Sequence, residues 1–405
     1  MTILVTGGAG YVGSHTVRAM LEAGYQVVVA DNLSTGFRAA VPAACRFYEG
    51  DIRDAAFLAR LFEQENIDGV IHFAAFSQVG ESGKLPLRYY DNNVSGTRVL
   101  LEQMTAHDVG TIVFSSSAAV YGEPEQVPIE ETAALDPTNC YGETKRVMER
   151  MMCWTAAATG LRYAALRYFN ACGAHPDGSL GEAHSPETHL IPLVLQVANG
   201  QRSEISVFGS DYPTPDGTCI RDYVHVCDLA QAHILALEYL LRGGESTAFN
   251  LGSGQGFSVR EVIEEARRVT GHAIPAVEKA RRSGDPARLV ASSEKPQSTL
   301  GRRPRYTALS PLLQHTSPPL HLPIYPTPPP PPLSHHPSPH SSFPPSSPFL
   351  LLCLPSPPFH PLTSPPQPSY SPHTPTPTHA PPPNATHHSH TTPPTRLPPQ
   401  PPTHT

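Results

Sequence analysis

A glycine-rich segment directly after the first apolar run constrains the fold more than any other feature of this chain. Thr6-Gly7-Gly8-Ala9-Gly10-Tyr11-Val12-Gly13 follows the strand-like run Ile3-Leu4-Val5 and opens a helical stretch. Glycines in such a turn let backbone N–H groups approach a pyrophosphate, and the helix N-terminus adds favourable partial positive charge. The second apolar run ends at Asp31, whose carboxylate can accept from both ribose hydroxyls and would repel a 2′-phosphate. The pattern predicts a dinucleotide site that prefers NAD to NADP.

Short apolar runs alternate with helical stretches from residue 1 to about 170, which is typical of a parallel sheet covered by helices. The runs are Ile3–Val5, Val27–Ala30, Arg46–Tyr48, Val70–Phe73, Ile112–Phe114 and Ala164–Tyr168. The helical stretches between them are 11–23, 54–65, 92–107 and 141–158. We therefore predict an α/β fold built on a doubly wound parallel sheet of the Rossmann type.

After residue 170 the alternation gives way to loops rich in Gly and Pro, with helices expected at 187–199, 226–241 and 258–270. We interpret residues 1–170 as a dinucleotide-binding domain. Residues 171–309 are then a smaller, mainly substrate-binding lobe that returns some elements to the first domain.

Residues 310–405 differ sharply in composition. They contain no Asp, Glu or Lys, one Arg, twelve His and about a third Pro. Proline on this scale favours disorder or polyproline II and disfavours a terminal helix beyond Leu309. The segment reads as a Pro/His/Ser/Thr-rich tail, produced by a shifted reading frame or a sequence error. A ligand for SH3-like domains is the alternative.

Charge and cysteine content limit the partners and the compartment. Residues 1–309 carry 27 basic and 35 acidic side chains, which argues against nucleic acid or an anionic membrane as the main partner. No signal peptide precedes Ile3, and no apolar run reaches membrane-spanning length. The seven cysteines form no CxxC pair, which suits a reducing cytoplasm. The histidines form no HExxH motif, and we assign no metal.

A second motif, Tyr141-Gly142-Glu143-Thr144-Lys145, follows the serines that end a predicted strand at Ser117. Spacing of four places Tyr141 and Lys145 on one face of a helix. An ammonium group held beside a phenol favours the phenolate and so lowers the tyrosine pKa. The phenolate can then act as a general base on an alcohol, with the Ser117 hydroxyl relaying or orienting the proton.

These motifs carry a resemblance to a known family. GxxGxxG, a strand-end serine and YxxxK form the signature of the extended short-chain dehydrogenases. Within that group, residues 1 to about 309 resemble the UDP-galactose 4-epimerases. The matching stretches include His72–Ala75, Val79–Ser82, Tyr89–Asn93, Ser115–Gly122, Arg167–Asn170, Phe208–Tyr212 and Gly217–Val226.

The resemblance implies a role for each residue at a matching position. Those expected at the cofactor are Gly7, Gly10, Tyr11, Val12, Gly13, Asp31, Asn32, Asp51, Ile52, Phe73, Ala74, Ala75, Asn92 and Phe169. Those expected at the substrate are Asn170, His189, Leu190, Phe208, Arg221, Arg282, Asp285 and Leu289. Leu289 stands where relatives that reject N-acetylated sugars carry a tyrosine, so we expect some activity on UDP-N-acetylglucosamine.

The resemblance implies an NAD-dependent isomerase that interconverts UDP-galactose and UDP-glucose. The sugar would be oxidised at C4 by bound NAD, the 4-keto sugar would turn, and reduction would follow on its other face. In this scheme Tyr141 takes the proton, Lys145 binds the nicotinamide ribose and Ser117 assists. Relatives of this kind lead us to expect a homodimer in the cytoplasm.

The sequence departs from the family pattern at several points. Ser77 replaces a frequent lysine, Ala119 replaces a hydroxyl residue, and Arg302 stands where tryptophan is expected. Another epimerase or a 4,6-dehydratase of the same fold is an alternative, but the dehydratase needs an Asp-Glu pair where this chain has Ala118-Ala119. The altered C-terminus also leaves open an inactive binding protein.

Overall fold

The computed structural model describes residues 1–282 and 285–316. The interpretation of residues 317–405 as a disordered tail concerns residues outside that description. Among the described helices, none combines the length and the apolar character that a bilayer crossing requires.

A seven-stranded parallel sheet forms the centre of the described region, in the order β10-β6-β5-β4-β1-β2-β3. This confirms the predicted doubly wound sheet. The strands are β1 (Thr2–Thr6), β2 (Gln26–Asp31), β3 (Arg46–Glu49), β4 (Gly69–His72), β5 (Thr111–Ser117), β6 (Arg162–Tyr168) and β10 (Thr247–Leu251).

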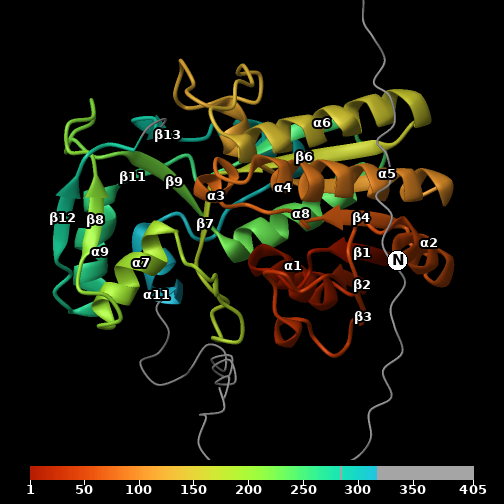
Figure 1. Cartoon of the computed structure of the whole chain (residues 1–405), viewed down its shortest axis with the longest axis horizontal. Helices are drawn as coiled ribbons and strands as arrows, with labels where there is room; N and C mark the ends of the chain where they lie inside the picture. The colour runs from red at the N-terminus through yellow and green to blue at the C-terminus, as the bar shows by residue number, and fades with distance from the viewer. Residues whose placement is uncertain (283–284, 317–405) are drawn as a thin grey trace, which may run out of the picture. The chain divides into compact units, whose positions relative to one another are not determined.

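Both faces of the sheet are buried because alternate residues of each strand point into different apolar cores. In β1, Ile3 and Val5 belong to one core and Leu4 to the other. The first core is closed by α1 (Tyr11–Glu22) and α8 (Val226–Leu241). The second is closed by three helices, α2 (Ala55–Gln64), α5 (Gly96–Ala106) and α6 (Cys140–Thr159) (Figure 1).

The end of α6 that carries the Tyr-Gly-Glu-Thr-Lys motif is fixed by a side-chain cap. Asn139 Oδ1 accepts from the N–H of Gly142 at 2.8 Å and so satisfies one of the free donors at the helix start. The helix ends at Gly160, which adopts the left-handed conformation (φ 79°) that ends many helices. Tyr141 and Lys145 therefore lie in the first turns of a helix with a defined start.

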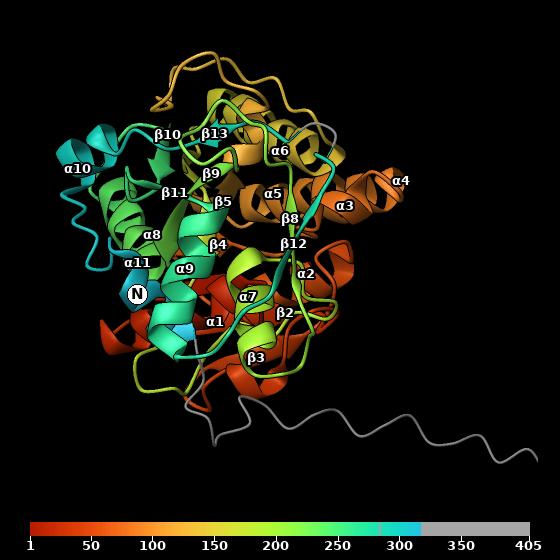
Figure 2. The same cartoon turned by 90° about the vertical axis from the view of Figure 1, so that its left-hand side faces the viewer.

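A smaller lobe is built on two further sheets. One joins β7 (Asn170–Cys172), β9 (Ile220–His225), β11 (Gly256–Ser258) and β13 (Arg288–Leu289), and the other joins β8 (Ile205–Phe208) and β12 (Ala276–Lys279). Helices α7 (Leu190–Ala198) and α9 (Val259–Thr270) share an apolar core with β8 (Figure 2). Short elements complete the fold: η1 (Arg38–Ala40), α3 (Val79–Ser82), α4 (Pro86–Tyr89), η2 (Tyr90–Ser95), η3 (Ala118–Tyr121) and α10 (Glu294–Leu300).

Residues 309–316 correct one expectation. We expected no helix beyond Leu309, yet α11 (Leu309–Thr316) packs against α9 and α7. Leu312 and Leu313 are fully buried in the core of the smaller lobe. Pro311 is compatible with this helix because it lies in the first turn, where a missing N–H costs nothing. The change in composition at residue 310 therefore begins inside the folded region, which continues to Thr316.

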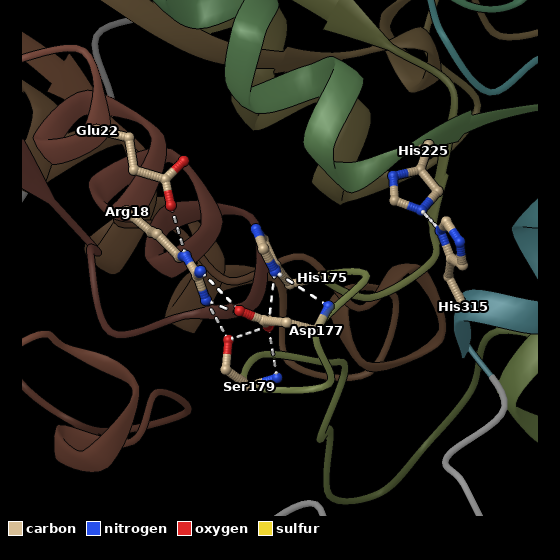
Figure 3. A network of polar contacts seen from close by, with 7 residues as sticks. All are labelled: Arg18, Glu22, His175, Asp177, Ser179, His225 and His315. Atoms are coloured by element: carbon tan, nitrogen blue, oxygen red, sulfur yellow. Dashed lines mark hydrogen bonds and ion pairs between the residues drawn. The ribbon is translucent and has the colours of Figure 1, made fainter.

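Polar contacts also tie α11 to the lobe, and two of them lie near its C-terminal end. His315 Nδ1 lies 3.0 Å from Nε2 of His225, the last residue of β9 (Figure 3). Thr316 Oγ1 accepts from the N–H of Gly173 at 3.0 Å. Gly173 has φ 90°, and a Cβ there would lie 2.5 Å from the His225 ring. Residue 173 must therefore be glycine, because a side chain there would collide with His225.

Candidate active site

The predicted residues gather at the carboxyl ends of the parallel strands, where ligands of such sheets bind. Gly7 follows β1, Phe73 follows β4, and Asp31 and Ser117 end β2 and β5. They line a cavity of about 450 Å³, a size typical of small-molecule sites. The cavity extends to Asp285 and Leu289 of the smaller lobe.

The glycine loop is shaped by close backbone contacts. Gly7 has φ 75°, and a Cβ there would lie 2.5 Å from the backbone nitrogen of Ala74. A Cβ at Gly13 would lie 2.2 Å from the carbonyl oxygen of Gly7. Gly10 caps α1 without a side-chain hydrogen bond, so the helix presents backbone N–H groups to the cavity. This is the arrangement that binds a pyrophosphate.

Asp31 is held in place by the backbone around it. Its Oδ2 accepts from the N–H of Ala9 at 3.0 Å and its Oδ1 from the N–H of Leu33 at 2.8 Å. Burial raises the pKa of Asp31, and the two backbone hydrogen bonds oppose that rise. Because a carboxylate oxygen has two lone pairs, each oxygen can accept one further hydrogen bond from a ribose hydroxyl.

Asp51 contacts Asn32, the residue that follows Asp31. Its Oδ2 accepts from Asn32 Nδ2 at 3.0 Å, and Arg53 pairs with the same carboxylate at 2.8 Å. The Arg53 hydrogen bonds lower the pKa of Asp51 to about 2. Asn32 and Ile52 line the cavity, whereas Asp51 itself does not.

Ser117, Tyr141 and Lys145 lie together at the end of β5. The Lys145 ammonium donates to the carbonyl oxygen of Ser115 at 2.7 Å and lies 5.8 Å from the centre of the Tyr141 ring. It also lies 4.8 Å from the centre of the Phe114 ring. Tyr141 and Lys145 are 9% and 3% exposed, so both polar groups act in a low-dielectric environment.

The pKa shifts at this site differ from the expectation. Burial raises the pKa of Tyr141, and the Ser117 hydroxyl is the neighbour that opposes the rise. Burial also lowers the pKa of Lys145 to about 7, although the Glu149 carboxylate acts in the other direction. The sequence argument that Lys145 lowers the pKa of Tyr141 is therefore wrong for the chain in this state, because both groups lose solvation together.

Five of the predicted residues do not line the cavity: Asp51, Leu190, Phe208, Arg221 and Arg282. Three of them are connected either to the cavity or to each other. Arg221 Nη2 pairs with Asp285 Oδ1 at 2.5 Å, and the Arg282 guanidinium lies 3.9 Å from the centre of the Phe208 ring. Leu190 begins α7, directly after the cavity residue His189.

The structure adds cavity residues that the sequence reasoning missed. Ser34 and Thr35 follow Asp31, and Tyr168 lies at the end of β6 with its hydroxyl hydrogen-bonded to Ser115. Glu182 and His184 line the side next to Tyr11. The recurrence of acid and histidine over residues 182–189 was a visible signal that could have identified the last pair.

The loop that follows β7 is fastened to the glycine-loop helix. Arg18 of α1 pairs with Asp177 at 2.7 Å, and Asp177 also accepts from the N–H of Ser179 at 2.9 Å (Figure 3). Tyr11 donates from its hydroxyl to the carbonyl oxygen of Gly173 at 2.5 Å. The smaller lobe is thus bonded directly to the segment expected to bind pyrophosphate.

Comparisons with known proteins agree with this geometry. Residues 3–252 match the family model "NAD dependent epimerase/dehydratase family". The chain is 59% identical to a UDP-glucose 4-epimerase of Halalkalibacterium halodurans, over 78% of this chain and 94% of that protein. A crystal structure of a UDP-glucose 4-epimerase from Brucella ovis in complex with NAD is 48% identical with a TM-score of 0.77, covering 78% and 97%. One from Bifidobacterium longum with NAD+ and UDP is 40% identical with a TM-score of 0.74, also covering 78% and 97%.

Proposed function

The chain belongs to the NAD dependent epimerase/dehydratase family, and on this premise we propose that Tyr141, Lys145 and Ser117 perform its chemistry. Its activity is the NAD-dependent interconversion of UDP-galactose and UDP-glucose. The observation that carries the residue assignment is the placement of a buried tyrosine and lysine beside a strand-end serine, in the wall of a dinucleotide cleft.

The cleft residues fit NAD. The glycine loop leaves no room for side chains between β1, β4 and the start of α1, and Gly10 leaves the helix N-terminus open. Asp31 ends β2 with free lone pairs on both carboxylate oxygens. We propose that the glycine loop and the N-terminus of α1 hold the pyrophosphate and that Asp31 holds the adenosine ribose.

In the proposed mechanism the protein handles the proton of the sugar hydroxyl. Bound NAD accepts the hydrogen of sugar C4 as hydride and returns it to the opposite face of the 4-keto sugar. Tyr141 removes the proton of the 4-hydroxyl and later returns it. Ser117, the neighbour that lowers the pKa of Tyr141, orients that proton. Lys145 is held by the carbonyl oxygen of Ser115, and its protonated form stabilises the forming phenolate.

We assign the nucleotide end of the substrate to the smaller lobe. Asn170, His189, Asp285 and Leu289 line that part of the cleft, and the Arg221–Asp285 pair brings a guanidinium to it. Arginine suits phosphate contacts because its fork can donate two parallel hydrogen bonds. The Arg282–Phe208 stack is proposed to hold the uracil side, and Leu289 to set the room around the sugar.

A turnover assay tests the proposal. Purified chain should convert UDP-galactose to UDP-glucose without added NAD, and UDP-N-acetylglucosamine should be accepted to some extent. A 4,6-dehydratase would instead release a 4-keto-6-deoxy sugar. Ala118 and Ala119 follow Ser117 and supply no acid or base for that second reaction. Formation of the dehydrated product, or no turnover of a folded chain that carries NAD, would refute the assignment.

We further propose a homodimer formed through α5 and α6. Trp154 is 70% exposed on α6, in a hollow that also includes Leu101 and Met151. Arg98 and Arg150 are among the charged residues of this hollow. An apolar patch with charged neighbours is typical of a protein–protein interface. Light scattering should give twice the chain mass for the wild type and for Gln201→Glu, and the chain mass for Trp154→Glu.

The compartment we propose is the cytoplasm. The cysteines of the described region, which are Cys45, Cys140, Cys153, Cys172, Cys219 and Cys227, are free thiols, as is typical in a reducing compartment. Fractionation of cells that express the chain would test this.

A further inference from the structure

Four acid and histidine side chains converge between β7 and α7. They are Glu182, His184, Glu187 and His189, here called the Glu/His cluster. Each offers one ligand atom, and these atoms all lie within 4.8 Å of one another. The four residues occupy eight consecutive positions, so a single loop delivers them to a common point. That point adjoins the substrate cleft, because Glu182, His184 and His189 also line the cavity.

The separations between the ligand atoms are close to those of a coordination shell. His189 Nδ1 lies 2.7 Å from Glu182 Oε1 and 3.2 Å from Glu187 Oε1. His184 Nδ1 lies 3.0 Å from Glu182 Oε1 and 3.7 Å from Glu187 Oε2. In tetrahedral zinc sites with bonds of about 2.0–2.2 Å, neighbouring ligand atoms lie roughly 3.3–3.6 Å apart. Three of the observed values lie below that range and one lies just above it, so the ligand atoms would move slightly apart around an ion.

Hydrogen bonding explains only part of this arrangement. Glu187 Oε1 accepts from the backbone N–H groups of Thr188 and His189 at 2.7 and 2.8 Å, which positions that carboxylate. An imidazole nitrogen carries at most one proton and aligns it with one acceptor. Yet each Nδ1 of the cluster faces both carboxylates, and both Nδ1 atoms face the same oxygen of Glu182. Convergence of two nitrogens and two carboxylates on one point is what a shared cation requires.

Burial provides a second, independent observation. The side chains of Glu182 and Glu187 are 2% and 8% exposed. The second oxygen of Glu182, Oε2, is buried with no hydrogen-bond partner among the described residues. A buried carboxylate with an unpaired oxygen is costly unless a cation neutralises it. A divalent ion would neutralise both carboxylates while leaving both imidazoles neutral.

We propose that the Glu/His cluster binds one Zn²⁺ ion. Two imidazole nitrogens and two carboxylates form a donor set that suits zinc. Four protein ligands fill a tetrahedral shell, so the ion is structural and takes no part in proton or hydride transfer. It fixes the loop between β7 and α7 as a wall of the cleft, and so holds His189 at the start of α7.

Cobalt spectroscopy of the full chain tests the proposal. The protein is treated with a chelator, loaded with Co²⁺ and examined for the intense visible bands of tetrahedral Co²⁺. Wild type and the control His272→Gln, whose side chain is exposed, should show these bands, and Zn²⁺ should abolish them. Glu182→Gln and His184→Gln should bind at least about 100-fold more weakly, which exceeds the loss typical of outer-shell changes. The histidines beyond residue 316 are present in every variant, so metal bound there cancels in the comparison.

Thermal unfolding separates a lost site from a misfolded variant. Zn²⁺ should raise the melting temperature of wild type and of His272→Gln, because an ion that binds the folded state stabilises it. It should not raise that of Glu182→Gln or His184→Gln, and all four proteins should retain NAD. Tetrahedral bands that persist in both cluster variants, or a wild type that gains no stability from Zn²⁺, would overturn the proposal and leave four ion-paired side chains.

Discussion

Arg167 and Glu149 form a buried bidentate ion pair beside the proposed catalytic residues. Nε and Nη2 of Arg167 donate to Oε1 and Oε2 of Glu149 at 3.0 and 2.6 Å. Ser116, next to Ser117, donates to the same carboxylate at 2.5 Å. Glu149 lies one turn beyond Lys145 on α6, so the pair joins α6, β5 and β6 at the point where they present the site.

Replacement of Glu149 by Gln should destabilise the fold. Arg167 would be left as a buried, unpaired charge, and a broken buried pair costs about 3–5 kcal/mol. The pKa of Lys145 should also fall further, since Glu149 is the group that raises it. Urea unfolding measures the first effect. The control is Glu278→Gln, which breaks the exposed pair with Arg260 and should cost under about 1 kcal/mol. Equal stability of the two variants would contradict the expectation.

Tyr141→Phe should reduce turnover of UDP-galactose by at least about 100-fold, the usual scale for loss of a general base. NAD content should stay unchanged, since the substitution removes one oxygen. Tyr163→Phe, a change in β6 away from the cleft, is the matched control and should turn over normally. Wild-type turnover in Tyr141→Phe would remove that residue from the mechanism.

Lys145→Met should stabilise the fold below neutral pH while abolishing activity. The pKa of Lys145 is about 7 in the folded chain against 10.5 ordinarily, because burial disfavours the ammonium. Between these values the unfolded chain binds more protons, so wild-type stability rises with pH. The burial cost is complete below about pH 7 and disappears near pH 10.5. The advantage of Lys145→Met should shrink over this window. A pH-independent difference in urea unfolding would count against this account.

Arg221→Ala should weaken UDP binding by about 10- to 100-fold, as expected for a lost charged hydrogen bond. Asp285 would lose its partner, but the NAD half of the cleft would keep its residues. Calorimetry with UDP, together with the NAD content, measures both effects. Arg260→Ala breaks an exposed pair with Glu278 and is the control. Unchanged UDP affinity in Arg221→Ala would refute the substrate assignment.

Leu312→Ala tests whether α11 belongs to the folded unit. Leu312 is fully buried, and truncation of a buried leucine costs about 2–5 kcal/mol. Leu87→Ala, at a leucine that is 80% exposed, should change the unfolding free energy by less than about 0.5 kcal/mol. If both variants unfold at the same urea concentration, α11 contributes nothing to the core.

The central sheet was largely predictable because its strands are short and continuously apolar. The runs at Ile3–Val5 and Val27–Ala30 became β1 and β2, and the expected helix at 226–241 became α8 with the same bounds. Strand β10 was not predicted. Its sequence Thr-Ala-Phe-Asn-Leu contains a buried Asn250, which hydrogen-bonds with Tyr121 and Ile129. Hydrogen-bond partners that come from distant parts of the chain cannot be recognised from the sequence of the strand itself.

The site was predictable where motifs have fixed spacing and was missed where loops bring residues together. Tyr141 and Lys145 follow from a helix period, and Asp31 follows from the end of a strand. The Glu/His cluster depends on how the loop before α7 folds, which periodicity does not specify. α11 was missed because its composition resembles the following tail, whereas its burial depends on contacts with α7 and α9.

Strand β10 also has a consequence for synthesis and for fragments of this chain. It adds to β6 from residues 247–251, long after the other six strands have left the ribosome. Until then β6 ends the sheet with a row of open backbone donors and acceptors. Such an edge pairs readily with strands of other molecules. A nascent or proteolysed chain that stops after β6 would hence hold most of the dinucleotide-binding fold and still tend to aggregate.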